Sequence, residues 1–301
     1  MNPSTLCRLL SVAALLATAN AQAQSRPMKV LISVDLEGIT GVVTGEQLGP
    51  AGFEYARFRE FMTAEAVAAV DAAKEAGATE VVVVDAHGNG QNLLIERFPA
   101  DVRIIRSWPR PQSMMQGIDS SFAAAIFIGY HSATTNTEGV RAHTISSGTF
   151  AAVVLNGIPM SESGINAAIA GHFGVPIVMI SGDDAAVLEA QRIIGPIEGA
   201  VVKRAISFHA ANTLTPAAGQ ALIRDKVRAG LAKRGSLRPY VMSGPIRLDI
   251  TFKNYTPAEI VAYLPGVERR DAHTIRYTAR NVLEVARFIQ FLTTYNAGMT
   301  P

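Results

Sequence analysis

Five acidic and imidazole side chains share one feature: each lies at or just beyond the end of a short apolar run that is typical of a buried strand. They are Asp35, Glu37, Asp85, His87 and His131. Asp35 and Glu37 are two positions apart, so they point to the same side if the extended backbone continues. Two neighbouring buried carboxylates repel one another unless a divalent cation lies between them. The sequence therefore predicts a metal site built from these residues.

The types of the candidate ligands restrict the metal. Imidazole and carboxylate together suit zinc, with manganese and iron as alternatives. One catalytic zinc usually takes three protein ligands and keeps one open position, and this sequence offers more ligands than that. Two zinc ions that share a bridging carboxylate fit better, and such a pair lowers the pKa of a bound water. Any one of these residues could instead form a turn or cap a helix, so the prediction depends on three strand ends having the same chemistry.

The remaining histidines and one further acid carry weaker signals. His143 lies beyond the last of these strand ends, and Glu162 opens a predicted helix. An acid in a first helical turn is favoured by the helix dipole, so the residue pattern alone gives Glu162 a structural role. No strand end precedes His172, His209 or His273. These three are expected to be surface or capping residues.

The elements that must position these residues alternate between apolar strands and amphipathic helices. The predicted strands of the first part of the chain are residues 29–34, 80–84, 102–105, 123–128 and 176–180. The predicted helices between and after them are residues 61–76, 162–170 and the segment from 184 to 194. This order indicates an α/β fold with a mostly parallel open sheet and helices on both faces. In such a sheet the ligand site lies outside the carboxyl ends of the strands, where the candidate ligands are.

Two domains are expected. Residues 28–195 would form the α/β metal-binding catalytic domain, within which Asn156-Gly157 predicts a hairpin turn. The character of the sequence changes after Gly195-Pro196, and the strand predicted at residues 246–252 alternates apolar and polar residues instead of being continuously apolar. Residues 196–301 are therefore expected to form a smaller C-terminal α+β domain.

Residues 1–23 have the layout of a secretory signal peptide. Arg8 precedes an apolar run, and small residues at Ala19, Ala21 and Ala23 offer cleavage sites. The run is much shorter than the roughly 20 residues that span a membrane. We therefore expect a secreted, periplasmic protein with no membrane segment after cleavage. The only cysteine is Cys7, so the mature chain would have no thiol to bind metal or to act as a nucleophile.

Composition and absent motifs exclude several classes of function. The formal net charge is +2, and the acids and bases are interspersed, which argues against nucleic acid as a partner. The sequence has no G-x-S-x-G nucleophile elbow and no phosphate-binding G-x-x-x-x-G-K-[ST] loop. Two alternatives to a peptidase remain: a metal-dependent phosphoesterase and a non-enzymatic periplasmic metal- or ligand-binding protein. Arg141 is the only clear basic residue near the predicted site, and a phosphate site would usually need more.

An ordered set of motifs resembles the zinc D-aminopeptidase family along nearly the whole chain, from about residue 28 to residue 295. The matching segments are Ser33–Gly38, Asp85–His87, Gly129–His131, Gly139-Val140 with His143, Glu162 with Gly164–Ala167, and Gly182–Asp184. Each segment alone is moderately specific, and their order is what identifies the resemblance.

The resemblance implies a set of protein ligands that binds two zinc ions per subunit. Asp35 would bridge the two ions, Glu37 and His87 would complete one site, and His131 and Glu162 would complete the other. This role for Glu162 replaces the structural one that its position in a helix indicates.

The resemblance also implies an activity and an assembly. His143 would be the catalytic residue beside the metals, and the substrates would be short peptides that lose an N-terminal D-residue such as D-alanine. The subunits would form a homo-oligomer, a ring-shaped homodecamer that encloses the active sites. The predicted signal peptide departs from this family, whose typical member lacks one.

Overall fold

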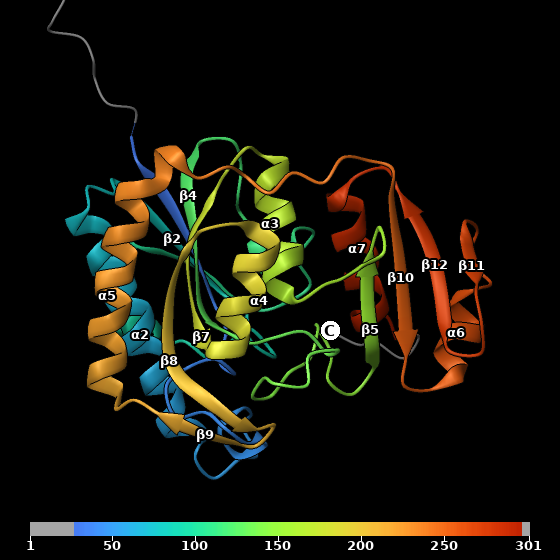
Figure 1. Cartoon of the computed structure of the whole chain (residues 1–301), viewed down its shortest axis with the longest axis horizontal. Coiled ribbons are helices and arrows are strands. Elements are labelled where there is room, and N and C mark those ends of the chain that lie inside the picture. Colours follow the sequence, from blue (N-terminus) through green and yellow to red (C-terminus); the bar gives the residue numbers. More distant parts are fainter. Residues whose placement is uncertain (1–26, 297–301) are drawn as a thin grey trace, which may run out of the picture.

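The computed structural model describes residues 27–296, which form two β-sheets and the helices that cover them (Figure 1). The predicted signal peptide, residues 1–23, lies outside the described residues. Within the described part, no helix combines the length and the apolar character that crossing a bilayer requires.

The larger sheet has seven strands and carries the candidate site. In spatial order they are β3 (Arg103–Ile105), β2 (Glu80–Asp85), β1 (Lys29–Val34), β4 (Phe122–Tyr130), β7 (Ile177–Asp183), β8 (Glu198–Ser207) and β9 (Ala210–Thr213). All neighbours are parallel except β8 and β9. β1 lies inside the sheet and is buried from Val30 to Val34, as its continuous apolar run predicts for a strand covered on both faces.

Helices cover both faces of this sheet. α2 (Tyr55–Glu75) and α5 (Pro216–Lys233) pack together on one face, and α3 (Glu162–His172) and α4 (Asp184–Ile194) lie on the other (Figure 1). Each face has its own apolar core, and the core on the α3 side continues into the second sheet. The predicted α/β fold with a mostly parallel sheet between helices is confirmed.

The smaller sheet has five antiparallel strands beside α3. In spatial order they are β11 (Val267–Arg269), β12 (Thr274–Ala279), β10 (Ile246–Phe252), β5 (Phe150–Leu155) and β6 (Ile158–Pro159). Two helices complete it, α6 (Tyr255–Val261) and α7 (Val282–Thr294), of which α7 lies between this sheet and α3 (Figure 1). The predicted hairpin joins β5 to β6, with φ values of 51° at Asn156 and 87° at Gly157.

The two sheets do not divide at the boundary between residues 195 and 196 that the sequence predicts. β8, β9 and α5 follow this boundary but belong to the larger sheet, because β8 pairs in parallel with β7. β5 and β6 precede it but belong to the smaller sheet, because β5 pairs with β10. These pairings join segments far apart in the chain, whereas the change of pattern after Gly195 reports only on local structure.

Candidate metal centre

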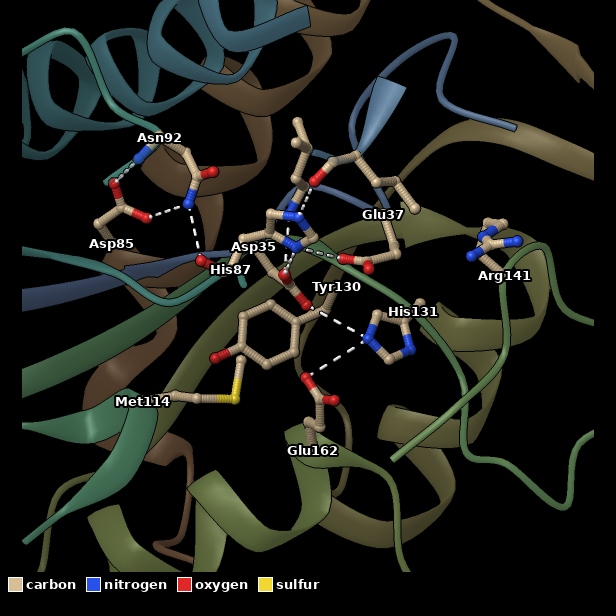
Figure 2. Close-up of polar contacts among 12 residues, drawn as sticks. Asp35, Glu37, Asp85, His87, Asn92, Met114, Tyr130, His131, Arg141 and Glu162 are labelled. Carbon is tan, nitrogen blue, oxygen red and sulfur yellow. Dashed lines mark hydrogen bonds and ion pairs between the residues drawn. The ribbon is translucent and has the colours of Figure 1, made fainter. Parts of the chain in front are cut away.

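The candidate ligands gather where β1, β2 and β4 end at one edge of the larger sheet (Figure 2). The register brings these ends level, since Val34 pairs with Asp85 on one side and with Ile128 on the other. Each of the five residues exposes 7% or less of its surface; they are Asp35, Glu37, His87, His131 and Glu162. The structure thus places together, in a buried cluster, all five residues that the resemblance implies as ligands.

Asp35 lies in the middle of the cluster, and its two carboxylate oxygens face opposite ways (Figure 2). Oδ1 is 3.2 Å from His87 Nδ1, which is also 2.8 Å from Glu37 Oε2. Oδ2 is 3.3 Å from His131 Nε2, which is also 3.4 Å from Glu162 Oε2. The cluster therefore consists of two half-sites, one with Glu37 and His87 and one with His131 and Glu162, joined by a single carboxylate.

Backbone carbonyls fix the orientation of both imidazoles. His87 Nε2 lies 2.7 Å from the carbonyl of Leu48, and His131 Nδ1 lies 3.0 Å from that of Ser132. A carbonyl only accepts hydrogen bonds, so each of these nitrogens carries the proton and donates it. The other nitrogen of each ring faces Asp35. This arrangement is the usual one for a histidine that binds a metal through one nitrogen while the other is held by the protein.

The donors fit zinc. Asp35 Oδ2 and His131 Nε2 are buried and have no hydrogen-bond partner, and a cation between them would satisfy both. Zinc binds nitrogen and oxygen at about 2.0–2.2 Å, so two of its tetrahedral ligands lie roughly 3.3–3.6 Å apart. The 3.3 Å between these two atoms is in this range. Ligand atoms of Asp35, Glu37 and His131 all lie within 4.8 Å of one another, as do those of His131, His143 and Glu162.

The electrostatics of the cluster favour charged forms despite complete burial. Burial by itself would raise the pKa of the carboxylates, but the imidazoles next to them lower the pKa of Asp35, Glu37 and Glu162 below their usual values. Burial would likewise lower the pKa of the imidazoles, yet the carboxylates raise the pKa of His87 and His131 well above the usual value. Three carboxylates therefore stay ionised in a buried position, and this negative charge favours the binding of divalent cations.

Two glycines let the ligand-bearing segments after β1 and β4 approach closely. The Gly38 amide donates to the Gly129 carbonyl at 2.7 Å, and a Cβ on Gly38 would lie 2.0 Å from the Tyr130 carbonyl oxygen. Gly129 has a φ of 70°, and a Cβ there would lie 2.2 Å from the carbonyl oxygen of Asp35. Any side chain at either position would separate Asp35 from the end of β4 and so from His131.

A buried lysine that the sequence analysis did not single out holds the loop after β1. Lys203 on β8 is 2% exposed, and its ammonium donates to the carbonyls of Glu37 at 2.5 Å, Ile39 at 3.1 Å and Val42 at 2.6 Å. Burial lowers the pKa of Lys203 to about 8. The signal for this contact is a lysine inside the predicted strand Val201–Ile206, since lysine is almost never buried without partners.

Glu162 reaches the cluster from the N-terminus of α3. Ser161 caps this helix by accepting from the Gly164 amide, and Glu162 Oε1 accepts from the Ile145 amide at 2.6 Å. The structural role that the residue pattern predicts for Glu162 is therefore incomplete, because its other oxygen faces His131. The structure shows why: the helix is buried from Glu162 to Gly171, so this acid is not a solvated residue of a first helical turn.

Asp85 was predicted to join the site, but its carboxylate turns away from it. It accepts from the Asn92 amide at 2.6 Å, from the Asn92 side chain at 2.8 Å and from the Leu93 amide at 2.8 Å (Figure 2). The Asn92 side chain also donates to the carbonyl of His87 at 2.7 Å. Asp85 thus shapes the loop that carries His87, because the loop's own backbone amides compete successfully for the carboxylate.

His143 stands beside the ligands and is less buried than they are. Its side chain is 13% exposed, and its ring stacks on that of His131 with the centroids 3.9 Å apart. Nε2 lies 3.7 Å from Glu162 Oε1 and 3.9 Å from Glu37 Oε1. The structure therefore places His143 at the boundary between the two half-sites and the space in front of them. His172 and His209 are exposed, as predicted.

A cavity of about 670 Å³ opens in front of the cluster. Its walls include Trp108, Ile145 and, from α7, Ile289 and Gln290, so the helix that packs on the smaller sheet completes a pocket whose floor lies at the edge of the larger one. Arg141 is the only lysine or arginine among the described residues that line it. A single guanidinium is fewer than a phosphate-ester site usually contains, which disfavours the phosphoesterase alternative.

The chain is similar to known peptidases over most of its length. The model of peptidase family M55, described as D-aminopeptidase, matches residues 28–291. A D-aminopeptidase from Bacillus subtilis (strain 168) is 34% identical over 267 residues, which cover 88% of this chain and 97% of that protein. A solved structure, described as the Zn-dependent D-aminopeptidase DppA from Bacillus subtilis, a self-compartmentalizing protease, matches with a TM-score of 0.85 and 33% identity, over 88% of this chain and 97% of the other. This chain belongs to the M55 family of D-aminopeptidases.

Proposed function

We propose that this protein is a two-zinc aminopeptidase that releases an N-terminal D-residue such as D-alanine from short peptides. The observation that carries the proposal is the position of Asp35, whose two oxygens face one imidazole each at 3.2 and 3.3 Å. Glu37 and His87 would complete one zinc site, and His131 and Glu162 the other. When bound, the zinc pair supplies a water of lowered pKa and polarises the scissile carbonyl.

His143 is the proton carrier in this proposal. Its Nδ1 lies 2.9 Å from the Arg141 carbonyl, which only accepts, so Nδ1 carries the proton and Nε2 presents a lone pair. Nε2 lies 3.9 Å from Glu37 Oε1 and 3.7 Å from Glu162 Oε1 at the floor of the cavity. From there it can take a proton as the nucleophile attacks and return it to the leaving amine.

The proposed zinc site supports preference for a free peptide N-terminus. A free N-terminal amine has a lone pair that one zinc ion could bind, whereas the nitrogen of a blocked or internal residue is an amide without a basic lone pair. The D-stereochemistry is supported by the names of the similar proteins, which are D-aminopeptidases.

We also propose a homodecamer that encloses the active sites, and a periplasmic location for the mature protein. The assembly is supported by the similar structure's description as self-compartmentalizing and by apolar side chains on the β8–β9 arm. Ile206 is 72% exposed, Phe208 42% and Leu214 38%, an apolar group that a second subunit would cover. Light scattering of the purified protein measures the subunit number, and cell fractionation measures the location.

A substrate panel tests the activity. The zinc-loaded protein is incubated with D-alanyl-D-alanine, L-alanyl-L-alanine and a generic phosphate ester, with and without a chelator. We expect chelator-sensitive release of D-alanine from the first substrate, slow or no cleavage of the second, and no cleavage of the third. Elemental analysis of the same sample should give two zinc ions per chain. Cleavage of the phosphate ester alone would contradict the proposal.

A further inference from the structure

Arg141 is a cation in the cavity that the zinc chemistry does not use. It lines the same cavity as His143 and the cluster, and in Figure 2 it lies apart from the ligands with no contact drawn to them. Among residues 27–296, no carboxylate lies within ion-pair distance of its guanidinium, and its Nε is buried without a hydrogen-bond partner. The guanidinium is therefore only partly satisfied by the protein itself.

The protein nevertheless holds this side chain in place. Arg141 has a φ of 56°, a left-handed backbone conformation that costs a non-glycine residue about 1–3 kcal/mol. Its amide donates to the Phe208 carbonyl at 3.0 Å, and its guanidinium lies over the Phe208 ring, 5.2 Å from the centroid. Its carbonyl accepts from His143. The strained backbone and the Phe208 ring thus hold the guanidinium in place. The same segment carries His143, the proposed proton carrier.

Charge balance also leaves Arg141 available. The cluster contributes three carboxylates, from Asp35, Glu37 and Glu162, and two zinc ions would more than neutralise them. Arg141 is then not needed to balance the floor of the cavity. A planar guanidinium matches a carboxylate through two parallel hydrogen bonds, which makes arginine well suited to recognise one.

The substrate class proposed above supplies such a carboxylate. A short unblocked peptide has a C-terminal carboxylate one or a few residues after the bond that is cleaved. Arg141 and His143 are two residues apart, so their Cα atoms lie within about 7 Å of one another. Each extra residue of an extended peptide moves its carboxylate by about 3.3–3.6 Å, so the shortest peptides keep it nearest to the segment that carries His143 and Arg141.

We propose that Arg141 is a specificity-determining residue that binds the C-terminal carboxylate of a short peptide substrate. This inference rests on the proposed function and predicts that dipeptides are preferred over longer peptides. It also assigns a role to the one basic residue that the sequence analysis noted near the site.

A matched pair of substrates tests the proposal on the full zinc-loaded protein. D-alanyl-D-alanine and D-alanyl-D-alaninamide differ only in the C-terminal charge. We expect kcat/KM to be about 10–100-fold higher for the acid, which is the value of one hydrogen-bonded charge pair, with most of the difference in KM.

Variants of Arg141 separate recognition from folding. Arg141→Met removes the charge and keeps a long side chain at the same backbone conformation, so it should cleave acid and amide equally while zinc content stays that of the wild type. Arg141→Lys should recover part of the preference for the acid. Arg204→Met is the matched control and should keep the full preference for the acid. The Arg204 side chain is 71% exposed on β8, pairs with Asp184 at 3.6 Å and does not line the cavity.

Two outcomes would overturn the role of Arg141. One is a wild-type protein that cleaves acid and amide at the same rate; the other is an Arg141→Met variant that keeps the preference for the acid. A zinc-loaded wild type that cleaves neither peptide contradicts the proposed function instead. In that case calorimetric titration with both peptides still tests Arg141: tighter binding of the acid that is lost in Arg141→Met supports it, and equal binding overturns it.

Discussion

The loop after β1 has two sides, and they treat buried charge in opposite ways. On the front, the carboxylates of Asp35 and Glu37 face imidazoles, and the pKa of both is lowered. On the back, Thr40 contacts Glu65 of α2, whose pKa burial raises to about 7, and Lys203 binds three loop carbonyls with its pKa lowered by burial to about 8. The front holds its carboxylates in the ionised form, whereas on the back burial moves the pKa of both Glu65 and Lys203 toward the neutral form.

This difference follows from the partners that each side provides. The front pairs acids with imidazoles in one cluster, so that protons can be exchanged for cations. On the back, Glu65 accepts from the Thr40 amide at 3.0 Å, and its second oxygen is buried without a partner. A lone buried carboxylate gains little from one amide, so burial dominates. The front therefore has the properties of a cation-binding site, and the back stabilises the loop. Variants on the front should mainly change zinc binding and activity, and variants on the back should mainly change stability.

The largest effect is expected from Asp35→Ala on the front. This change removes the carboxylate that faces both half-sites, so zinc binding and activity should both be lost. Elemental analysis and the D-alanyl-D-alanine assay measure the two. Asp101→Ala is the control, since the Asp101 side chain is 71% exposed and pairs with Lys74 far from the cluster in the fold. A full zinc content in Asp35→Ala would refute the bridging role.

The next largest effect is expected from His143→Ala, which lies on the front but outside the ligand set. The variant should keep both zinc ions, while kcat falls by roughly 10²–10⁴, the usual contribution of an acid–base group. Zinc content and steady-state kinetics on one preparation check this. Turnover at the parental rate would remove His143 from the mechanism, and loss of zinc would make it a ligand.

A smaller effect on activity is expected from Lys203→Met on the back. The change leaves the carbonyls of Glu37 and Val42 without a donor, while the Ile39 carbonyl keeps the Val42 amide, and each buried unsatisfied group costs about 1–3 kcal/mol of stability. Because Glu37 moves with the loop, zinc affinity should also fall, by about 10–100-fold as for other groups that orient ligands. Urea unfolding and competition with a chelator measure both. Lys233→Met, on an exposed part of α5, should change neither.

The smallest effect on activity is expected from Glu65→Gln, which should change the pH dependence of stability instead. The folded pKa of Glu65, about 7, lies above the ordinary value of 4.5. The folded state therefore binds this proton more tightly, and the resulting stability is fully present below about pH 4.5 and lost as the pH rises through 7. The free energy of unfolding of the wild type minus that of Glu65→Gln should fall across this window. A difference that is constant with pH would show that Glu65 titrates normally.

The sequence predicted the strands that carry ligands better than the site as a whole. The runs before Asp35, His87 and His131 became β1, β2 and β4, because continuous apolar runs of this length are buried strands in a parallel sheet. Because these runs also mark where each strand ends, the sequence showed that carboxylates and imidazoles follow the strand ends. Asp85 was the error, since nothing in a strand-end pattern distinguishes a carboxylate that faces a cavity from one that binds the amides of Asn92 and Leu93.

What the sequence alone determined is local: the order of strands and helices, the hairpin at Asn156-Gly157, and the residue types at the carboxyl ends of the strands. The tertiary structure decided which ligand shares a half-site with which, and it placed Lys203 behind the loop after β1 and Arg141 in the cavity wall. It also decided that β5 pairs with β10 rather than with the larger sheet. The physical reason is that periodicity and capping act between neighbouring residues, whereas pairing and charge compensation depend on segments that meet only after the chain has folded.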